Sequence, residues 1–351
     1  MSESTKKVII GGVPVGGGES VKVQSMCTAK TSDTEETVNQ INSLQDAGCE
    51  IIRVSVLDKD DAAAIKIIKN KIKIPLVADI HFSAELAVKS IENGADKVRI
   101  NPGNIGGESN IERVADCIKA HKIPVRVGAN TGSVEKEFLE KYGKNEISLV
   151  ESALRSAACL EKYGVNDIVI SVKASDVPLT VKAYRLLSKR ADYPLHIGVT
   201  EAGTEQMAVV KSSAALGSLL LDGIGDTLRV SITGDPIKEI YAAKRLLRAV
   251  GLDKNFVDVI SCPTCGRCLW DSMKLAEEVT AYTETINKPL KIAVMGCVVN
   301  GHGEAKDCDL GIAGAQDYCV IFKHGEIIRK VTAQNAAQEF FKEIKSILND
   351  C

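Results

Sequence analysis

The chain has 351 residues, of which 45% are hydrophobic and 26% charged, so it can bury an extensive core and favours two domains over one. Its net charge of −2, its 4% aromatic content and the lack of a basic arm argue against nucleic acid as the main partner. No apolar run has membrane-spanning length, and eleven cysteines without a secretory signal indicate a cytoplasmic protein rather than a disulfide scaffold.

Short β-rich runs alternate with helical patterns through the first two thirds of the chain. The helical segments carry apolar residues three and four apart, as in Val38, Ile41 and Leu44. About eight such units predict a (β/α)8 TIM-type barrel over residues 1–250, with an open doubly wound sheet as the alternative. The predicted strands are Val21–Met26, Ile51–Val56, Pro75–Ile80, Lys97–Asn101, Pro124–Val127, Asp167–Lys173, Leu195–Thr200 and Thr227–Ile232.

Polar side chains gather near the carboxyl ends of six of these strands. Within a strand they are two or four residues apart, so they point to one face of the extended chain. Five strands supply a cation there, and converging cations repel one another unless something neutralises them. Either acids on neighbouring strands do so or the barrel mouth binds a polyanion such as a diphosphate, which is the interpretation we favour. The candidate substrate-binding residues are Arg53, Asp79, His81, Arg99, Asn101, Arg126, Asn130, Lys173, Arg229 and Ser231.

Thr200 and Glu201 follow the seventh predicted strand and are candidate catalytic residues. Glu201 is an obvious acid or base among so many cations, whose field would keep it ionised until the phosphate of a substrate compensates that field. Asp79 and His81 could bind a metal, but two ligands do not make a site, so hydrogen bonds to substrate are the preferred interpretation. Three histidines without chemical neighbours are interpreted as structural: His121, His196 and His324.

After residues 251–255, which have the composition of a linker, residues 256–351 are predicted to form a small α+β domain. Two of its strands lead into Gly-containing turns that carry cysteines. The predicted elements are the strands Phe256–Ser261, Lys291–Met295, Tyr318–Lys323 and Glu326–Lys330 and the helices Met273–Ile286 and Thr332–Leu348.

The cysteines of this second domain describe a metal site. Cys262 and Cys265 are three apart, so one turn presents both sulfurs to a single centre, and Cys297 supplies a distant third. A closed zinc site normally has a second paired knuckle, whereas Cys297 and Cys308 are eleven apart. The spacing leaves an iron–sulfur cluster, a zinc ion and reduced buried cysteines as alternatives. It disfavours a radical-type cluster, which needs a Cys-x-x-x-Cys-x-x-Cys run, because Cys262, Cys265 and Cys268 are spaced three and three.

Several motifs together resemble one family. In the barrel they are Val-Gln24-Ser25-Met, Arg53-Val-Ser, Ala-Asp79-Ile-His81-Phe, Arg99-Ile-Asn101-Pro-Gly, Arg126-Val-Gly-Ala-Asn130 and Gly-Val-Thr200-Glu201-Ala-Gly. In the second domain they are Ser-Cys262-Pro-Thr-Cys265-Gly-Arg and Met-Gly-Cys297-Val-Val-Asn300-Gly-x-Gly-Glu304. From about Val21 to Gly314 the chain resembles the 4-hydroxy-3-methylbut-2-enyl diphosphate synthases of the methylerythritol phosphate route to isoprenoids, in their compact bacterial form.

The resemblance implies a [4Fe–4S] cluster held by Cys262, Cys265, Cys297 and the carboxylate of Glu304. It implies reductive opening of 2-C-methyl-D-erythritol 2,4-cyclodiphosphate with loss of a hydroxyl as water. The electrons would come from a ferredoxin or flavodoxin. Thr200 and Glu201 would then act near the departing hydroxyl, and Asn300 would touch the substrate from the cluster side.

The resemblance also implies a homodimer in which the cluster domain of one subunit covers the barrel of the other. The residues alone leave two further functions open. A zinc-stabilised barrel would bind a phosphorylated metabolite without chemistry, and a cluster-dependent hydro-lyase would use iron as a Lewis acid without net electron transfer. A requirement for reductant separates the hydro-lyase from the reductive synthase.

Overall fold

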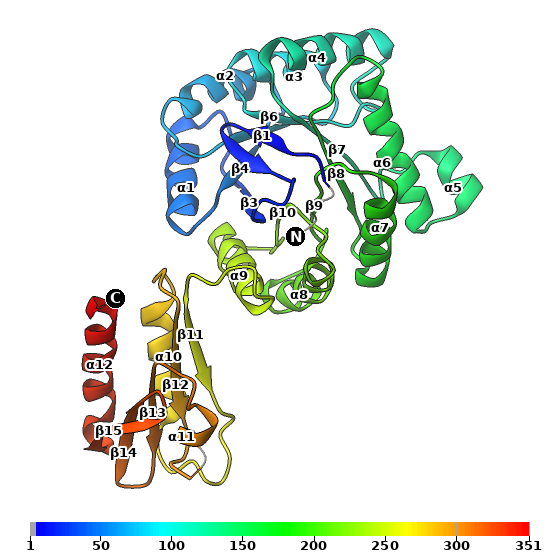
Figure 1. Ribbon diagram of the computed structural model, residues 1–351. Helices are drawn as coiled ribbons and strands as arrows, with labels where there is room; N and C mark the ends of the chain where they lie inside the picture. Colours follow the sequence, from blue (N-terminus) through cyan, green and yellow to red (C-terminus); the bar gives the residue numbers. More distant parts are fainter. Residues whose placement is uncertain (1–4, 300, 351) are drawn as a thin grey trace. The chain divides into compact units, whose positions relative to one another are not determined.

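The computed structural model describes residues 5–299 and 301–350, with only the backbone described at positions 302, 304 and 350 (Figure 1). It divides into two compact units, Met1–Leu252 and Asp253–Cys351. Across these ranges, none of the helices combines the length and the apolar character that crossing a membrane requires.

The first unit is an eight-stranded parallel barrel, which confirms the predicted fold class. Its strands are adjacent in the order β8-β7-β6-β5-β4-β3-β10-β9, and a parallel bridge between Ile170 and Leu195 joins β8 to β9. Every predicted strand is present, with ends displaced by a few residues. The strands are β3 Lys22–Met26, β4 Ile51–Ser55, β5 Leu76–Asp79, β6 Lys97–Arg99, β7 Val125–Asn130, β8 Ile168–Lys173, β9 His196–Ile197 and β10 Thr227–Leu228.

Helices surround this barrel, each following a strand and packing apolar side chains on it (Figure 1). Their starts obey capping chemistry: the Ser83 hydroxyl accepts a hydrogen bond from the Leu86 amide at 3.2 Å, and Pro236 opens its helix after the capping residue Asp235. The helices are α1 Thr34–Asp46, α2 Lys59–Lys69, α3 Ala84–Glu92, α4 Glu108–His121, α6 Glu146–Glu161, α7 Val177–Arg190, α8 Glu205–Leu221 and α9 Pro236–Ala249. A further helix, α5 Lys136–Tyr142, was not among the predicted elements and buries no residue.

A hairpin at the start of the chain closes one end of the barrel. Its strands β1 (Val8–Ile10) and β2 (Val13–Val15) pair antiparallel. The hairpin packs on barrel residues near the amino ends of β4, β5 and β8, so it plugs the end opposite to the strands' carboxyl ends. This buried apolar cluster consists of Val8, Ile10, Val15, Ile51, Val77 and Val169.

The second unit is the expected small α+β domain. Its five-stranded sheet has the order β11-β12-β13-β14-β15, parallel from β11 to β13 and antiparallel after that. Helices α10 and α12 contribute to one apolar cluster on the sheet, while α11 is followed by residues of a second cluster. The elements are β11 Val257–Ser261, α10 Ser272–Thr283, β12 Leu290–Met295, α11 Gly301–Glu304, β13 Leu310–Gly314, β14 Tyr318–Lys323, β15 Glu326–Thr332, the 3-10 turn Ala333–Asn335 and α12 Ala336–Asp350.

Candidate functional site

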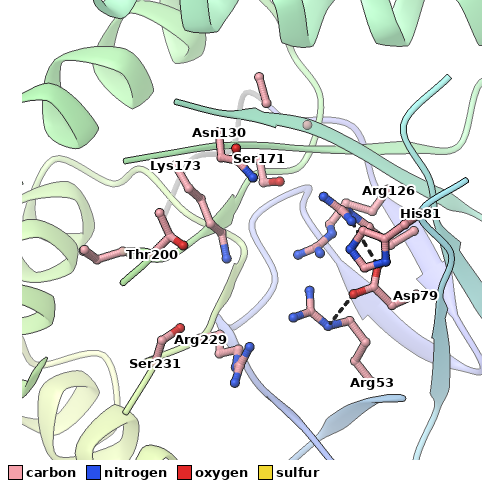
Figure 2. A pocket seen from close by; sticks show the side chains of 14 residues that line it. Arg53, Asp79, His81, Arg126, Asn130, Ser171, Lys173, Thr200, Arg229 and Ser231 are labelled. Carbon is pink, nitrogen blue, oxygen red and sulfur yellow. Dashed lines mark hydrogen bonds and ion pairs between the residues drawn. The ribbon is translucent and has the colours of Figure 1, made fainter. Parts of the chain in front are cut away.

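A cavity of about 160 Å³ opens at the carboxyl ends of the barrel strands (Figure 2). Every residue proposed to bind substrate lines it except Asn101, and Thr200 lines it as well. The neutral wall is completed by Ser171 and by small residues of β7. The lining side chains are Arg53, Asp79, His81, Arg99, Arg126, Asn130, Ser171, Lys173, Val199, Thr200, Arg229 and Ser231.

Asp79 neutralises two of the five cations of this cavity. Its Oδ1 accepts a hydrogen bond from Nη1 of Arg99 at 3.1 Å, and its Oδ2 lies 3.6 Å from Nε of Arg53. Burial alone would raise the pKa of Asp79, but the guanidiniums of Arg53 and Arg99 outweigh it and lower that pKa. Asp79 on β5 thus fixes the direction of two guanidiniums, one on each flanking strand, β4 and β6.

Glu239 of α9 neutralises a third cation and was not identified from the sequence. Its carboxylate binds Arg229 in a two-point pair, with Nη2–Oε1 and Nε–Oε2 distances of 3.0 and 3.1 Å. The same carboxylate accepts hydrogen bonds from the Ser25 hydroxyl at 2.9 Å and from the Ile232 amide at 3.1 Å. One feature of the sequence could have identified Glu239. It lies beside Ile240 on the buried face of the helix, where an acid without a cationic partner would be unfavourable.

The two remaining cations have no carboxylate partner among the side chains that the structure describes. Arg126 is 3% exposed, and its Nε and Nη1 have no hydrogen-bond partner there. Lys173 is half-buried and forms no ion pair within the same ranges. Burial, reinforced by the neighbouring cations, lowers the pKa of both groups well below the usual ranges. Neutralisation by neighbouring acids therefore accounts for only three of the five cations.

The other candidate residues of the barrel lie around the cavity. Asn101 has its Oδ1 bonded to the Gly103 amide at 3.0 Å, so its side chain shapes the loop after β6. Glu201 follows Thr200 with an exposed side chain and a left-handed backbone, φ 52°. Such a conformation costs a non-glycine residue about 1 kcal/mol or more and tends to occur at functional sites.

We expect Asp79→Asn to destabilise the folded protein above about pH 4 and to lose that effect in stronger acid. The pKa of Asp79 is lowered in the folded state, so its contribution is present above the unfolded-state pKa and disappears as the pH falls through the folded-state pKa. Urea unfolding of both proteins between pH 6 and pH 3 measures this. A stability difference that does not change with pH would contradict the assignment.

The cysteine loops of the second unit meet at neighbouring strand ends. Strands β11 and β12 are paired in parallel; Cys262 and Cys265 follow the first and Cys297 follows the second. The Gly296 amide donates a hydrogen bond to Sγ of Cys262 at 3.1 Å. A Cβ on Gly296 would lie 3.4 Å from that sulfur and 3.0 Å from Sγ of Cys268, so a larger residue here would crowd both sulfurs.

The donor chemistry of these loops fits a group held by thiolates. The backbone N–H and the side chain of Arg267 lower the pKa of the exposed Cys265 thiol, which favours the thiolate that binds metals. Cys268 is engaged differently, since its Sγ lies 3.2 Å from both the Trp270 carbonyl oxygen and the Ser272 hydroxyl. No three acidic, histidine or cysteine side chains within the described ranges are placed to hold one metal ion. Asn300 and the side chain of Glu304 lie outside those ranges.

Trp270, the only tryptophan of the chain, anchors the residue before Cys297. Its indole N–H donates a hydrogen bond to the Gly296 carbonyl oxygen at 3.2 Å. Gly314 on β13 leaves room for the ring, because a Cβ there would lie 2.1 Å from the indole nitrogen. Gly296 is therefore held from both sides, by Trp270 and by Cys262.

Two family models match the chain, one for each unit. Residues 5–244 match the GcpE TIM-barrel domain, and residues 258–346 match the GcpE protein C-terminal domain. Together they cover both the cationic cavity and the cysteine loops.

Curated relatives match along the whole chain. The 4-hydroxy-3-methylbut-2-en-1-yl diphosphate synthase (flavodoxin) of Caldanaerobacter subterraneus subsp. tengcongensis is 54% identical over 351 residues, covering 100% of this chain and 99% of that protein. The proteins of the same name from Clostridium perfringens and Ruminiclostridium cellulolyticum are 50% and 49% identical, each over 98% of this chain and 99% and 98% of their own length.

Among solved structures, the dihydropteroate synthase of Yersinia pestis aligns with a TM-score of 0.51 and 12% identity. The alignment covers 69% of this chain and 97% of that one. At this identity the likeness concerns the barrel fold alone.

Proposed function

The chain belongs to the GcpE family, and on that premise we propose that its barrel cavity binds the cyclic substrate and its second unit carries the cluster. The reaction is the reductive ring opening and dehydration of 2-C-methyl-D-erythritol 2,4-cyclodiphosphate to 4-hydroxy-3-methylbut-2-enyl diphosphate, a step of isoprenoid biosynthesis. In this proposal residues 1–250 are the substrate domain and residues 256–351 the cluster domain.

The observation that carries the substrate assignment is the excess of cations over acids in the cavity. Arg126 and Lys173 lack carboxylate partners in the described structure and are available to phosphate oxygens. Arg53, Arg99 and Arg229 also face the cavity, in directions fixed by Asp79 and Glu239. The diphosphate is both the binding group and the leaving group of the ring opening, so these cations stabilise the charge that develops as the ring opens.

Neutral polar groups complete the site. His81, Asn130 and Ser231 line the cavity and would hydrogen-bond the oxygens of the methylerythritol skeleton. Thr200 would orient the departing hydroxyl, and Glu201, the exposed residue that follows it, would supply the proton. Asn101 would position the loop beside the ligand, and Asn300 would contact the substrate from the cluster domain.

We propose that the second unit holds a [4Fe–4S] cluster through Cys262, Cys265, Cys297 and Glu304. The hydrogen bond from Gly296 to Cys262 and the lowered pKa of the Cys265 thiol support thiolate ligation. Bound there, the cluster supplies the two electrons of the reduction, one at a time. The names of the relatives specify flavodoxin, which we propose as the donor, with ferredoxin as the alternative. The ten cysteines that the structure describes are not paired in disulfides, which supports a reducing, cytoplasmic location.

We further propose a homodimer in which each active site is shared between subunits. Large apolar side chains are exposed in segments that follow barrel strands at the cavity end: Leu57, Phe82 and Met207 are 71%, 75% and 54% exposed. Others flank the cysteine loops: Leu269, Met273 and Val299 are 58%, 61% and 70% exposed. Joining these two apolar surfaces between subunits would bury both and exclude water from the substrate.

Mixing a Cys297→Ser subunit with a Glu201→Gln subunit should restore activity that neither variant has alone. In a heterodimer with shared sites, one of the two sites combines an intact barrel with an intact cluster domain. Separately tagged subunits, purified as the heterodimer and assayed under anaerobic conditions, provide the measurement. Verified heterodimers without recovered activity would rule out the shared geometry.

The function itself is tested by anaerobic purification followed by iron, sulfide and zinc analysis and an assay with the cyclic diphosphate. We expect about four irons and four sulfides per chain, visible absorption that bleaches with dithionite, and turnover that requires a reductant. Zinc without sulfide would favour the metabolite-binding alternative. Turnover without any reductant would favour the hydro-lyase.

A further inference from the structure

A group of buried polar side chains lies inside the barrel, below the cavity, and has no role in the proposed reaction. Gln24, Lys97 and His196 are 1%, 0% and 0% exposed, and Arg126 reaches the group from the cavity wall. Within the described ranges, the atoms without hydrogen-bond partners are Oε1 and Nε2 of Gln24, Nζ of Lys97, Nε and Nη1 of Arg126 and Nε2 of His196.

The strand register places these side chains in the barrel interior. Lys97 precedes Arg99 by two residues on β6, so both point to the same side, and Arg99 lines the cavity. His196, on β9, lies four residues before Thr200, which lines the cavity, so it lies deeper in the barrel. Gln24 is paired across the strands with Ile51, which belongs to the apolar plug. The group therefore lies between the plug and the cavity, and we call it the interior chamber.

Lys97 is the most exceptional member of the interior chamber. A buried ammonium without an acceptor is strongly unfavourable, because neither water nor a carboxylate replaces its hydration. The charged groups that act on it are Arg126 and Arg53, both cations, and burial together with these two lowers the pKa of Lys97 well below its usual range. Asp79, on the adjacent strand, is already paired with Arg53 and Arg99.

Other groups of the interior chamber do not relieve this charge. His196 uses Nδ1 in a contact of 2.8 Å with the Thr227 hydroxyl, and burial lowers the pKa of its ring, so it stays neutral. The hairpin contributes only aliphatic side chains to the plug. Buried polar atoms without protein partners are commonly satisfied by ordered water.

We propose that Lys97, buried in the interior chamber without an acceptor among the described residues, is a neutral amine in the free enzyme and takes up one proton from solvent when the diphosphate binds above it. The identity of the ligand rests on the proposed function. The only bond formed is the third N–H of the ammonium. The polyanion favours the charged form of nearby amines, so the barrel carries this buried charge only while the substrate compensates it.

Calorimetric titration measures the proton uptake. The oxidised enzyme, which cannot turn over without reductant, is titrated with the cyclic diphosphate at about pH 8 in buffers of different protonation enthalpy. We expect the wild type to take up more protons per bound substrate than Lys97→Met, by up to one. Lys97→Arg is the matched control, because its permanent charge should remove the same uptake.

Groups that titrate in every variant, such as Lys173 and the substrate phosphates, cancel in this comparison. The difference should shrink as the pH falls, because Lys97 is then already protonated in the free enzyme. Equal proton uptake by the wild type and both folded variants would overturn the inference while leaving the function intact. Failure of the wild type to bind the cyclic diphosphate would instead overturn the proposed function.

Discussion

Replacing Arg126 by methionine should weaken binding of the cyclic diphosphate by about 100-fold and should also stabilise the free protein. Arg126 is buried, and two of its nitrogens have no partner in the described structure, so its charge costs free energy until a phosphate arrives. Methionine removes that cost and fills similar space. We therefore expect the stability of the free protein to rise while its affinity for the cyclic diphosphate falls, as in other sites where binding residues reduce stability.

Arg53→Met is the matched control. Arg53 lies in the same cavity but is paired with Asp79, so its removal weakens both binding and stability. Calorimetry with the cyclic diphosphate gives the affinities, and urea unfolding of the free proteins gives the stabilities. If Arg126→Met were destabilised as much as Arg53→Met, Arg126 would be a structural cation and not one reserved for substrate.

Cys262→Ser should remove the cluster and lower activity by on the order of 100-fold or more, while binding of the cyclic diphosphate to the barrel is retained. Cys268→Ser is the matched control, because the Cys268 sulfur contacts the Trp270 carbonyl and the Ser272 hydroxyl, partners that a serine hydroxyl can also bind. We expect this second variant to keep its iron and most of its activity.

Trp270 offers a readout that is independent of activity. It is the sole tryptophan, and its hydrogen bond to the Gly296 carbonyl places it beside the cysteine loops, so an absorbing cluster there should quench its fluorescence. Cluster reconstitution should therefore dim the emission of the wild type and of Cys268→Ser but not that of Cys262→Ser. Equal quenching in all three proteins would exclude Cys262 as a ligand.

The barrel could be predicted because its signals are local. Apolar spacing marked the strands and helices, and the two-residue repeat of a strand indicated that Asp79 shares a face with His81 and that Arg126 shares a face with Asn130. The parallel arrangement of the strands then placed them at one end, where they line the cavity.

The missed features have little signal of their own in the sequence. Glu239 is one acid among many, and only the packing of α9 on the barrel brings it to Arg229 and Ser25. Strand β13 is buried throughout, so Leu310–Gly314 shows no alternation of polar and apolar residues. That Nζ of Lys97 has no hydrogen-bond partner among the described residues could not be foreseen either, because a lysine at a strand start usually reaches solvent.

The pairing of β3 with β10 bears on how the protein is made. It joins Lys22 to Thr227, residues about 200 positions apart, and such pairings are slow to form because a long loop must close first. During synthesis the hairpin and β3 leave the ribosome early and β10 leaves it late. The hairpin valines Val8 and Val15 are therefore exposed until the barrel that buries them is complete. The hairpin closes the finished barrel. In the nascent chain, its apolar side chains are thus exposed to aggregation for most of the synthesis.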